Sequence, residues 1–195
     1  MKKKLLILPL FIAAMFLVNL SAKAQFALGI HGSYFVPDAK GADGVFGGGI
    51  HGKIFASPQF ALGVGLKVVG EENKGTGYKV TNSIVPVTAM AEYYFSDSGI
   101  RPYIGAEAGV YFSSLKYEIT GFGEQTFKQN NFGAGPKLGL AIPIGNLGIF
   151  AEGSYTFIFD NKDNSANTSA GNIDFKSSSK FFMVNAGITV GFGGK

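Results

Sequence analysis

The sequence predicts an all-β fold, an eight-stranded antiparallel up-and-down barrel that crosses a membrane. Apolar residues alternate with small or polar ones through most of residues 25–192, and a strand points successive side chains to opposite faces. Charged residues within these alternating runs fall on the less apolar face. Short turns alternate with long polar loops. A transmembrane barrel requires this combination of an uncharged apolar outside and a polar inside.

Residues 1–24 predict a cleaved signal peptide. Lys2–Lys4 form a basic start, Leu5–Leu20 are almost wholly apolar, and Ala22 and Ala24 occupy the two positions that signal peptidase reads. A retained helical anchor is the alternative, but the apolar segment is short for a membrane helix. We therefore expect cleavage before Gln25 and a single barrel domain over residues 25–195.

Composition excludes several classes of function. Four of the 17 Lys and Arg residues lie in the predicted signal peptide, which leaves 13 against 13 Asp and Glu. A neutral mature chain does not favour nucleic acid as a partner. The absence of Cys excludes a disulfide scaffold, thiolate chemistry and a Cys-based metal site. No cofactor is predicted.

Four strands are predicted in the first half: Gln25–Val36, Val45–Ala56, Phe60–Val69 and Ile84–Phe95. Each carries one apolar row, although Pro86 and Met90 make the inner parity of the fourth less polar. A modest loop surrounds Pro37–Gly41. Ser57–Gln59 predicts a tight turn, because Pro supplies turn geometry and lacks a ladder donor. The charged, glycine-containing segment Gly70–Lys79 is predicted to be a loop.

Four more strands follow: Ile100–Phe112, Phe132–Ile142, Leu147–Phe159 and Lys180–Phe192. Their out-facing rows hold about five or six residues, which suits a tilted crossing of a bilayer. Ser96–Gly99 and Pro143–Asn146 predict short turns. The polar region Ser113–Asn131 alternates in part, consistent with strands that continue beyond the bilayer. Asp160–Ser179 is the longest polar segment and is expected to be a mobile loop.

Two sequence segments resemble a known family. The strand entry Arg101-Pro102-Tyr103-Ile104-Gly105-Ala106 and the ending Gly187–Phe192, together with the eight alternating strands, resemble the small outer-membrane β-barrels. This family includes the membrane domain of outer membrane protein A and its OmpX-like and OmpW-like, porin-family relatives. The resemblance implies the outer membrane of a Gram-negative bacterium, contact with its lipid, and insertion by the outer-membrane assembly machinery. Many relatives end on an aromatic residue that this machinery reads, whereas Phe192 here precedes Gly193-Gly194-Lys195.

The charged residues within strands are predicted to face the lumen. They are Lys53, Lys67, Glu92, Arg101, Glu107, Lys137 and Glu152. A selectivity ring or proton path is one interpretation, and a structural plug of salt bridges is the other. Eight strands enclose little more than side chains or one small ligand, which favours the plug. Lys137 and Glu152 are predicted to pair, because residues opposed across the Pro143–Asn146 hairpin would sum to about 289.

His31 and His51 are also predicted to point into the lumen at similar heights. Two His side chains can bind a metal or sense pH, but no third ligand is evident nearby in the sequence, which favours polar lumen residues. Ser33 shares their face through alternation alone, so we do not predict a catalytic Ser/His/acid set or any enzyme activity. Asp160–Asn164 only weakly resembles a calcium loop, because Lys162 occupies a ligand position.

The predicted function is that of an integral outer-membrane barrel with a side-chain-filled lumen. It would act structurally or through its external loops on an extracellular partner that the sequence does not identify, or pass small solutes if the lumen opens. A secreted or periplasmic lipocalin-like binding barrel is the alternative, which requires the apolar parity inside. The other parity is rich in Gly and Ala and would make a poor soluble surface. This favours the membrane barrel.

Overall fold

The computed structural model describes residues 25–38, 44–119, 123–159, 166–168, 171–173 and 180–191. Its barrel strands are β1 (Gln25–Pro37), β2 (Val45–Ser57), β3 (Phe60–Gly75), β4 (Tyr78–Tyr94), β5 (Arg101–Ile119), β6 (Gly123–Ile144), β7 (Leu147–Phe159) and β10 (Lys180–Val190). The short strands β8 (Ala166–Thr168) and β9 (Gly171–Ile173) form a separate two-stranded sheet. The predicted signal peptide and the ending from residue 192 lie outside the described residues. Within the described residues, no helix is long and apolar enough to cross a membrane.

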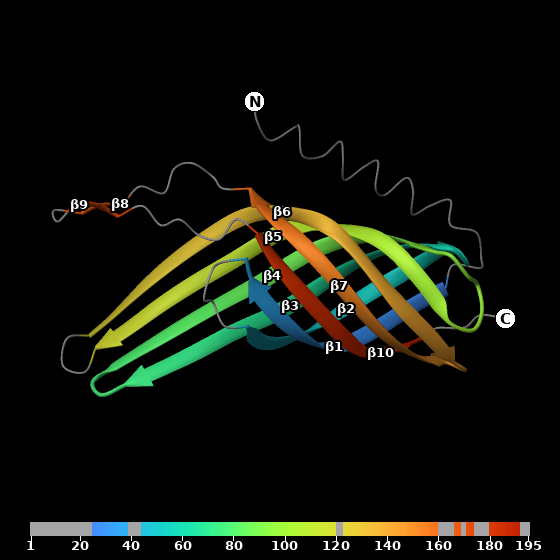
Figure 1. Ribbon diagram of the computed structural model, residues 1–195, viewed down its shortest axis with the longest axis horizontal. Helices are drawn as coiled ribbons and strands as arrows, with labels where there is room; N and C mark the ends of the chain where they lie inside the picture. The colour runs from blue at the N-terminus through green and yellow to red at the C-terminus, as the bar shows by residue number, and fades with distance from the viewer. Residues whose placement is uncertain are drawn as a thin grey trace, which may run out of the picture.

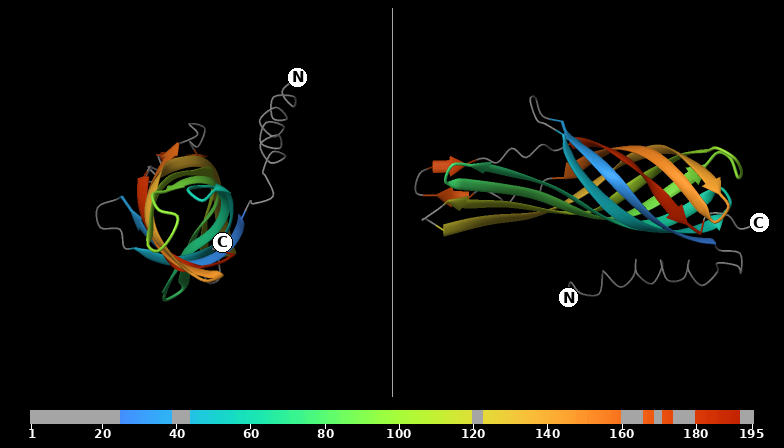
Figure 2. Two further views of the ribbon diagram at one scale, coloured as in Figure 1. Left: turned by 90° about the vertical axis from the view of Figure 1, so that its right-hand side faces the viewer. Right: turned by 90° about the horizontal axis from the view of Figure 1, so that it is seen from below.

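The eight long strands close into one barrel. Each strand pairs antiparallel with its neighbours in the chain, and β1 closes the ring against β10. Figure 2 shows this ring in the view along the barrel, and Figure 1 shows the strands tilted across it. The predicted fold, an eight-stranded antiparallel up-and-down barrel, is confirmed.

Side chains alternate between the outside and the lumen as the sequence predicts. On the outside, Leu138 is 67% exposed and Ile30 is 58% exposed, whereas the lumen residue Tyr94 is fully buried. Such a continuous apolar exterior is far larger than the patches that soluble proteins expose, and it suits lipid. The lipocalin-like alternative is therefore wrong, because the charged parity faces the lumen.

Aromatic residues gather near both ends of the apolar exterior. Near the long loops, Tyr34 packs on Phe46 with ring centroids 4.8 Å apart, and Phe132 stacks on Phe159 at 6.0 Å. At the other end, the exposed rings include Phe26, Phe60, Tyr93 and Phe95. Transmembrane barrels carry such aromatic girdles where hydrocarbon meets the headgroups.

The lumen is filled by three layers of side chains. An apolar layer near the short turns contains Ala27, Phe55, Ala61, Tyr94, Tyr103, Ala141 and Phe150. A second apolar layer near the long loops contains Phe35, Val69, Tyr111, Phe181 and Met183. Charged residues lie between the two layers. The barrel interior is thus a packed core rather than an open tube.

The turn between β6 and β7 differs from the prediction. It is a two-residue turn at Gly145 and Asn146, where Gly145 adopts a left-handed conformation with φ of 63°. Opposed residues therefore sum to 291, and Glu152 faces Gly139 rather than Lys137. The predicted register was wrong by two residues, because Pro143 lies in the strand and not in the turn.

One predicted loop is largely strand, and the Ser113–Asn131 region continues its two strands as predicted. Gly70–Lys79 was predicted to be a loop, but β3 and β4 stay paired from Gly70↔Ser83 to Gly75↔Tyr78, and Gly77 makes the turn with φ of 85°. β5 and β6 likewise pair as far as Ile119↔Gly123. Of the predicted mobile loop Asp160–Ser179, only β8 and β9 are described.

These longer strands build a four-stranded sheet beyond the barrel. We call it the extension, and it comprises residues 70–75 of β3, 78–83 of β4, 113–119 of β5 and 123–131 of β6. Figures 1 and 2 show β3 to β6 running well past the ends of the other strands.

Candidate functional site

A chain of ion pairs crosses the middle of the lumen. Glu92 on β4 accepts contacts from Lys53 on β2 at 2.8 Å and from Lys137 on β6 at 2.9 Å. Lys137 also contacts Glu152 on β7 at 2.8 Å. Lys137 and Glu152 therefore pair diagonally despite the shifted register, and the long lysine side chain spans the offset. All four side chains are almost fully buried.

Hydrogen bonds continue this chain around the barrel. The Tyr103 hydroxyl donates to Glu152 Oε2 at 2.7 Å, and the Asn185 amide on β10 donates to Glu152 Oε1 at 3.0 Å. Ser33 on β1 then donates to Asn185 Oδ1 at 2.6 Å. The Tyr94 hydroxyl satisfies Glu92 from the short-turn side at 2.7 Å. Glu92 and Glu152, the two carboxylates in this chain of ion pairs, thus each contact at least one lysine and at least one neutral hydrogen-bond donor.

A second ion pair completes the layer. Lys67 on β3 contacts both carboxylate oxygens of Glu107 on β5, at 2.9 and 3.1 Å. Together the two groups use a side chain from each of the eight barrel strands. Their three lysines and three glutamates balance, which buried charges require if they are to remain ionised.

Arg101 lies apart from this layer. It sits near the short turns, where its Nε donates to the Ser96 carbonyl at 3.0 Å and its guanidinium also contacts the Pro58 carbonyl. The guanidinium carbon is 4.5 Å from the centre of the Tyr94 ring. Arg101 therefore ties two turns to the end of the barrel, whereas the other six predicted charged residues lie in the middle layer.

His31 and His51 lie side by side in the lumen. Their Nδ1 atoms are 3.4 Å apart, and the edge of Phe150 packs against both rings. Both Nε2 atoms are buried without a hydrogen-bond partner among the described residues. Within the same residues, no group of three or more His, Asp or Glu side chains is placed to hold a metal ion.

Several residues of the lumen network were not assigned to it from the sequence. Tyr94, Tyr103, Asn185 and Ser33 share the parity of the charged residues, so alternation places them in the lumen. Alternation does not give their height, however, and so does not reveal which carboxylate each one reaches. Tyr103 and Glu152, for example, are 49 residues apart in the chain.

The extension has a charged outer face, which continues the lipid-facing parity of the barrel. This outer charged face carries Glu72, Lys74, Lys79, Lys116, Glu118, Glu124 and Lys128. Glu72 bridges Lys74 and Lys79 at 2.6 and 2.7 Å. Lys116 bridges Glu118 and Glu124 at the same two distances. The change from apolar to charged side chains marks where these strands leave the bilayer.

These ion pairs shift the titration of the outer charged face. Hydrogen bonds from Lys74 and Lys79 lower the pKa of Glu72 to about 2. The hydrogen bond from Lys116 lowers the pKa of Glu118, and the two glutamates together raise the pKa of Lys116. The face therefore keeps its alternating charges through the neutral range.

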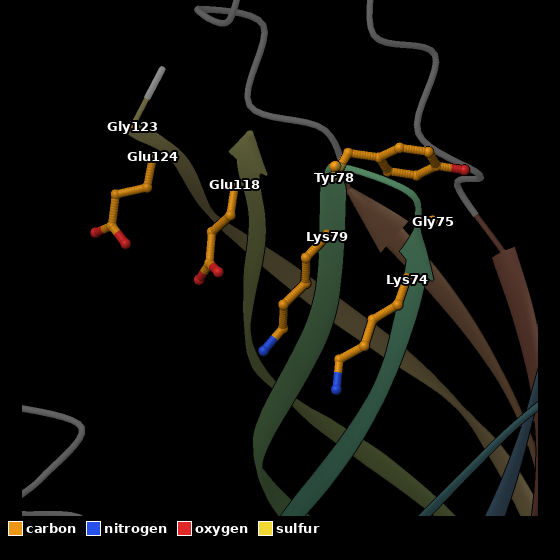
Figure 3. Close-up of a pocket in the computed structure, with 8 residues that line it drawn as sticks. Lys74, Gly75, Tyr78, Lys79, Glu118, Gly123 and Glu124 are labelled. Atoms are coloured by element: carbon orange, nitrogen blue, oxygen red, sulfur yellow. The ribbon is translucent and has the colours of Figure 1, made fainter. Parts of the chain in front are cut away.

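The opposite face of the extension mixes aromatic and aliphatic side chains with polar ones. This inner aromatic face continues the lumen parity and carries Tyr78, Val80, Leu115, Tyr117 and Phe127, beside Glu71, Asn73, Asn82, Gln125 and Gln129. The rings of Tyr117 and Phe127 make an edge contact with their centroids 6.4 Å apart, yet Phe127 is 49% exposed. Figure 3 shows the split, with Lys74 and Lys79 next to each other and Tyr78 directed away from them. The extension therefore presents two chemically different surfaces outside the barrel.

No protein-family model matches the sequence, and no curated protein matches it either. Solved structures of bacterial outer-membrane proteins do match. Neisserial surface protein A is 18% identical with a TM-score of 0.62, and the match covers 86% of this chain and 97% of that one. A major outer membrane protein from Thermus thermophilus is 15% identical with a TM-score of 0.62, covering 85% and 98%.

The attachment invasion locus protein Ail of Yersinia pestis is also similar. It is 13% identical with a TM-score of 0.58, and the match covers 86% of this chain and 96% of that one. At these identities the likeness establishes the fold. The resemblance to small eight-stranded outer-membrane barrels is thus confirmed at the level of architecture.

Proposed function

We propose that this protein is an integral outer-membrane barrel of a Gram-negative bacterium that binds a partner through its extension and passes no solute. Export uses a signal peptide cleaved before Gln25, and the assembly machinery inserts the barrel. The observation that carries the proposal is the layered lumen, in which charged and aromatic side chains from all eight strands are almost fully buried.

The lumen charges act as a structural plug in this proposal. A conducting pore exposes its charged side chains to water, whereas Glu92, Lys137 and Glu152 are each at most 6% exposed. Their oxygens and nitrogens contact one another and neutral donors, so no position is left for a passing ion. Apolar layers above and below exclude water from the pairs.

The extension is the surface available for a partner. Four strands carry it beyond the bilayer, and its inner aromatic face exposes rings that a barrel wall alone does not need. The similar Ail protein of Yersinia pestis forms a complex with the heparin analogue sucrose octasulfate. Here glutamates bridge three of the four lysines on the outer charged face, Lys74, Lys79 and Lys116, which favours a partner other than a polysulfated one.

Two measurements test the proposal. Purified protein in planar bilayers is expected to give no channel steps, and steady conductance would contradict the plug. On intact cells, Thr76→Cys at the tip of the extension is expected to react with a membrane-impermeant maleimide. The matched control is Asn146→Cys in a short turn, which reacts only after the outer membrane is opened. The chain has no other Cys, so labelling of Asn146→Cys alone would invert the proposed orientation.

A further inference from the structure

The extension has an open edge on β6. This strand pairs with β7 only from Phe132 onward, so among the described residues Gly123–Asn131 is paired with β5 alone. We call Gly123–Asn131 the β6 edge. A strand edge without a neighbour presents backbone N–H and C=O groups that can accept another strand.

The charges of the β6 edge are complementary to those of a second copy of the same edge that runs antiparallel to it. Glu124 and Lys128 lie on the same face, two residues to either side of Thr126. A two-fold axis at Thr126 places Glu124 of each copy directly opposite Lys128 of the other. Opposite charges in this position stabilise a strand pair. An axis at Gln125 or Phe127 would lose both contacts.

The side chains concerned are accessible. The Glu124 side chain is 63% exposed although it contacts Lys116, and Lys128 has no ion pair among the described residues. On the other face, the same axis places Phe127 opposite Gln125 and diagonal to Phe127 of the second copy. Diagonal aromatic residues reach each other across a strand pair. Pairing would therefore also cover an exposed ring.

The symmetry fixes how the two barrels are oriented. The two β6 edges pair as antiparallel neighbours in one continuous sheet, with the outer charged faces of both copies on the same side. The two-fold axis that relates such a pair is perpendicular to the sheet. The extension continues the barrel strands away from the bilayer (Figures 1 and 2). Such an axis therefore runs parallel to the membrane, and the two barrels point toward each other from facing membranes.

We propose that the β6 edge joins two copies of this chain on facing membranes, as a homotypic contact between cells. The inference rests on the proposed function, because it needs the extension outside the cell. Nine residues span about 30 Å at 3.3 Å per residue, so the contact requires surfaces that approach to roughly that distance. Each contact is small, and many in parallel supply the avidity.

Charge reversal in protein-loaded vesicles tests the pairing. Wild-type vesicles are expected to aggregate, and Lys128→Glu or Glu124→Lys vesicles are each expected to lose aggregation, because like charges then face each other. Mixing the two variants is expected to restore it, since every Glu again faces a Lys. If Lys128 instead protected the edge, Lys128→Ala would increase aggregation, and the proposal would be overturned.

Charge reversals away from the β6 edge control for the effect of net charge on vesicle aggregation. Lys79→Glu and Glu118→Lys carry the same net charges on β4 and β5, and their vesicles are expected to aggregate as the wild type does, alone or mixed. If the two control variants also fail to aggregate alone, and aggregate only when they are mixed with each other, attraction between oppositely charged vesicles explains the result. That outcome would overturn the proposal. Heat-modifiable gel mobility verifies that each variant is folded.

A crosslink tests the register. Thr126→Cys lies on the proposed axis, so oxidation is expected to yield disulfide-linked dimers between vesicles. Thr81→Cys is the control, because it lies on the same face, two strands from the edge. Equal crosslinking of both, or of neither, would overturn the register. Absence of any wild-type aggregation overturns this inference alone, since maleimide labelling and conductance still test the proposed function.

Discussion

Lys137 is the residue on which the lumen network depends most. It contacts two carboxylates, Glu92 and Glu152, whereas Lys53 contacts only the first of them. Removing its charge leaves two buried carboxylates with one cation to share. The cost of an uncompensated buried charge far exceeds the worth of an exposed ion pair.

Lys137→Met is expected to destabilise the barrel by about 3–5 kcal/mol, measured by urea unfolding from lipid vesicles. Combining it with Glu152→Gln is expected to cost less than the two single changes added together, because the second change removes one orphaned charge. Lys116→Met is the matched control on the outer charged face and is expected to have little effect. Additive costs in the cycle would contradict the pairing.

Glu72 is expected to titrate far below an ordinary glutamate. Its pKa is lowered from 4.5 to about 2 by hydrogen bonds from Lys74 and Lys79. Both lysines stabilise the ionised form of Glu72. The pairing therefore persists at neutral pH and is lost as the pH falls through about 2. Carboxyl NMR measures this midpoint. Changing both lysines to Gln is expected to return it toward 4.5, and an unchanged midpoint would show that they are not its cause.

The strands themselves are specified by parity. Replacing Leu138 on β6 or Ala186 on β10 by Arg puts a charge near the middle of the bilayer and is expected to cost about 2–4 kcal/mol. Asn130→Arg is the control, because Asn130 has the same parity on β6 but lies beyond Phe132, at the start of the extension. Folding into vesicles measures all three. Equal tolerance of Leu138→Arg and Asn130→Arg would contradict the assigned position of the bilayer.

Alternation made the barrel strands predictable from the sequence, because a strand has only two faces and one of them must be free of charge. Turn geometry was less accessible. Pro143 indicated a turn, yet the turn lies two residues later at Gly145, whose left-handed backbone suits a two-residue hairpin. Parity survives such a shift of two residues, so Lys137 and Glu152 kept their faces while their register was wrong.

The extension was missed at Gly70–Lys79 for a related reason. Its strands reverse the barrel pattern, with charges such as Glu72 on the lipid-facing parity and apolar residues such as Val80 on the lumen parity. A segment that is charged and contains glycine is typical of a loop, whereas here the charges pair across strands. The sequence also does not give the position of a lumen residue along the barrel axis, which is why Arg101 was grouped with residues of the middle layer.

The whole molecule divides into two parts with separate sources of stability. The barrel is held by its lumen layers, all of which lie below the extension. The extension is held by its own strand pairing and by ion pairs such as Glu72 with Lys79. The barrel should therefore fold without the extension.

Trimming both hairpins tests this division. Gly70 pairs with Ser83 and Ser113 with Gln129, so replacing residues 71–82 and 114–128 by Asn-Gly keeps each register and supplies a two-residue hairpin turn. The trimmed protein is expected to insert into vesicles and to keep its heat-modifiable gel mobility, because every lumen ion pair remains. It is also expected to lose vesicle aggregation along with the β6 edge. Failure to fold would show instead that the extension is part of the barrel's folding unit, as when the long β5–β6 hairpin nucleates the ring.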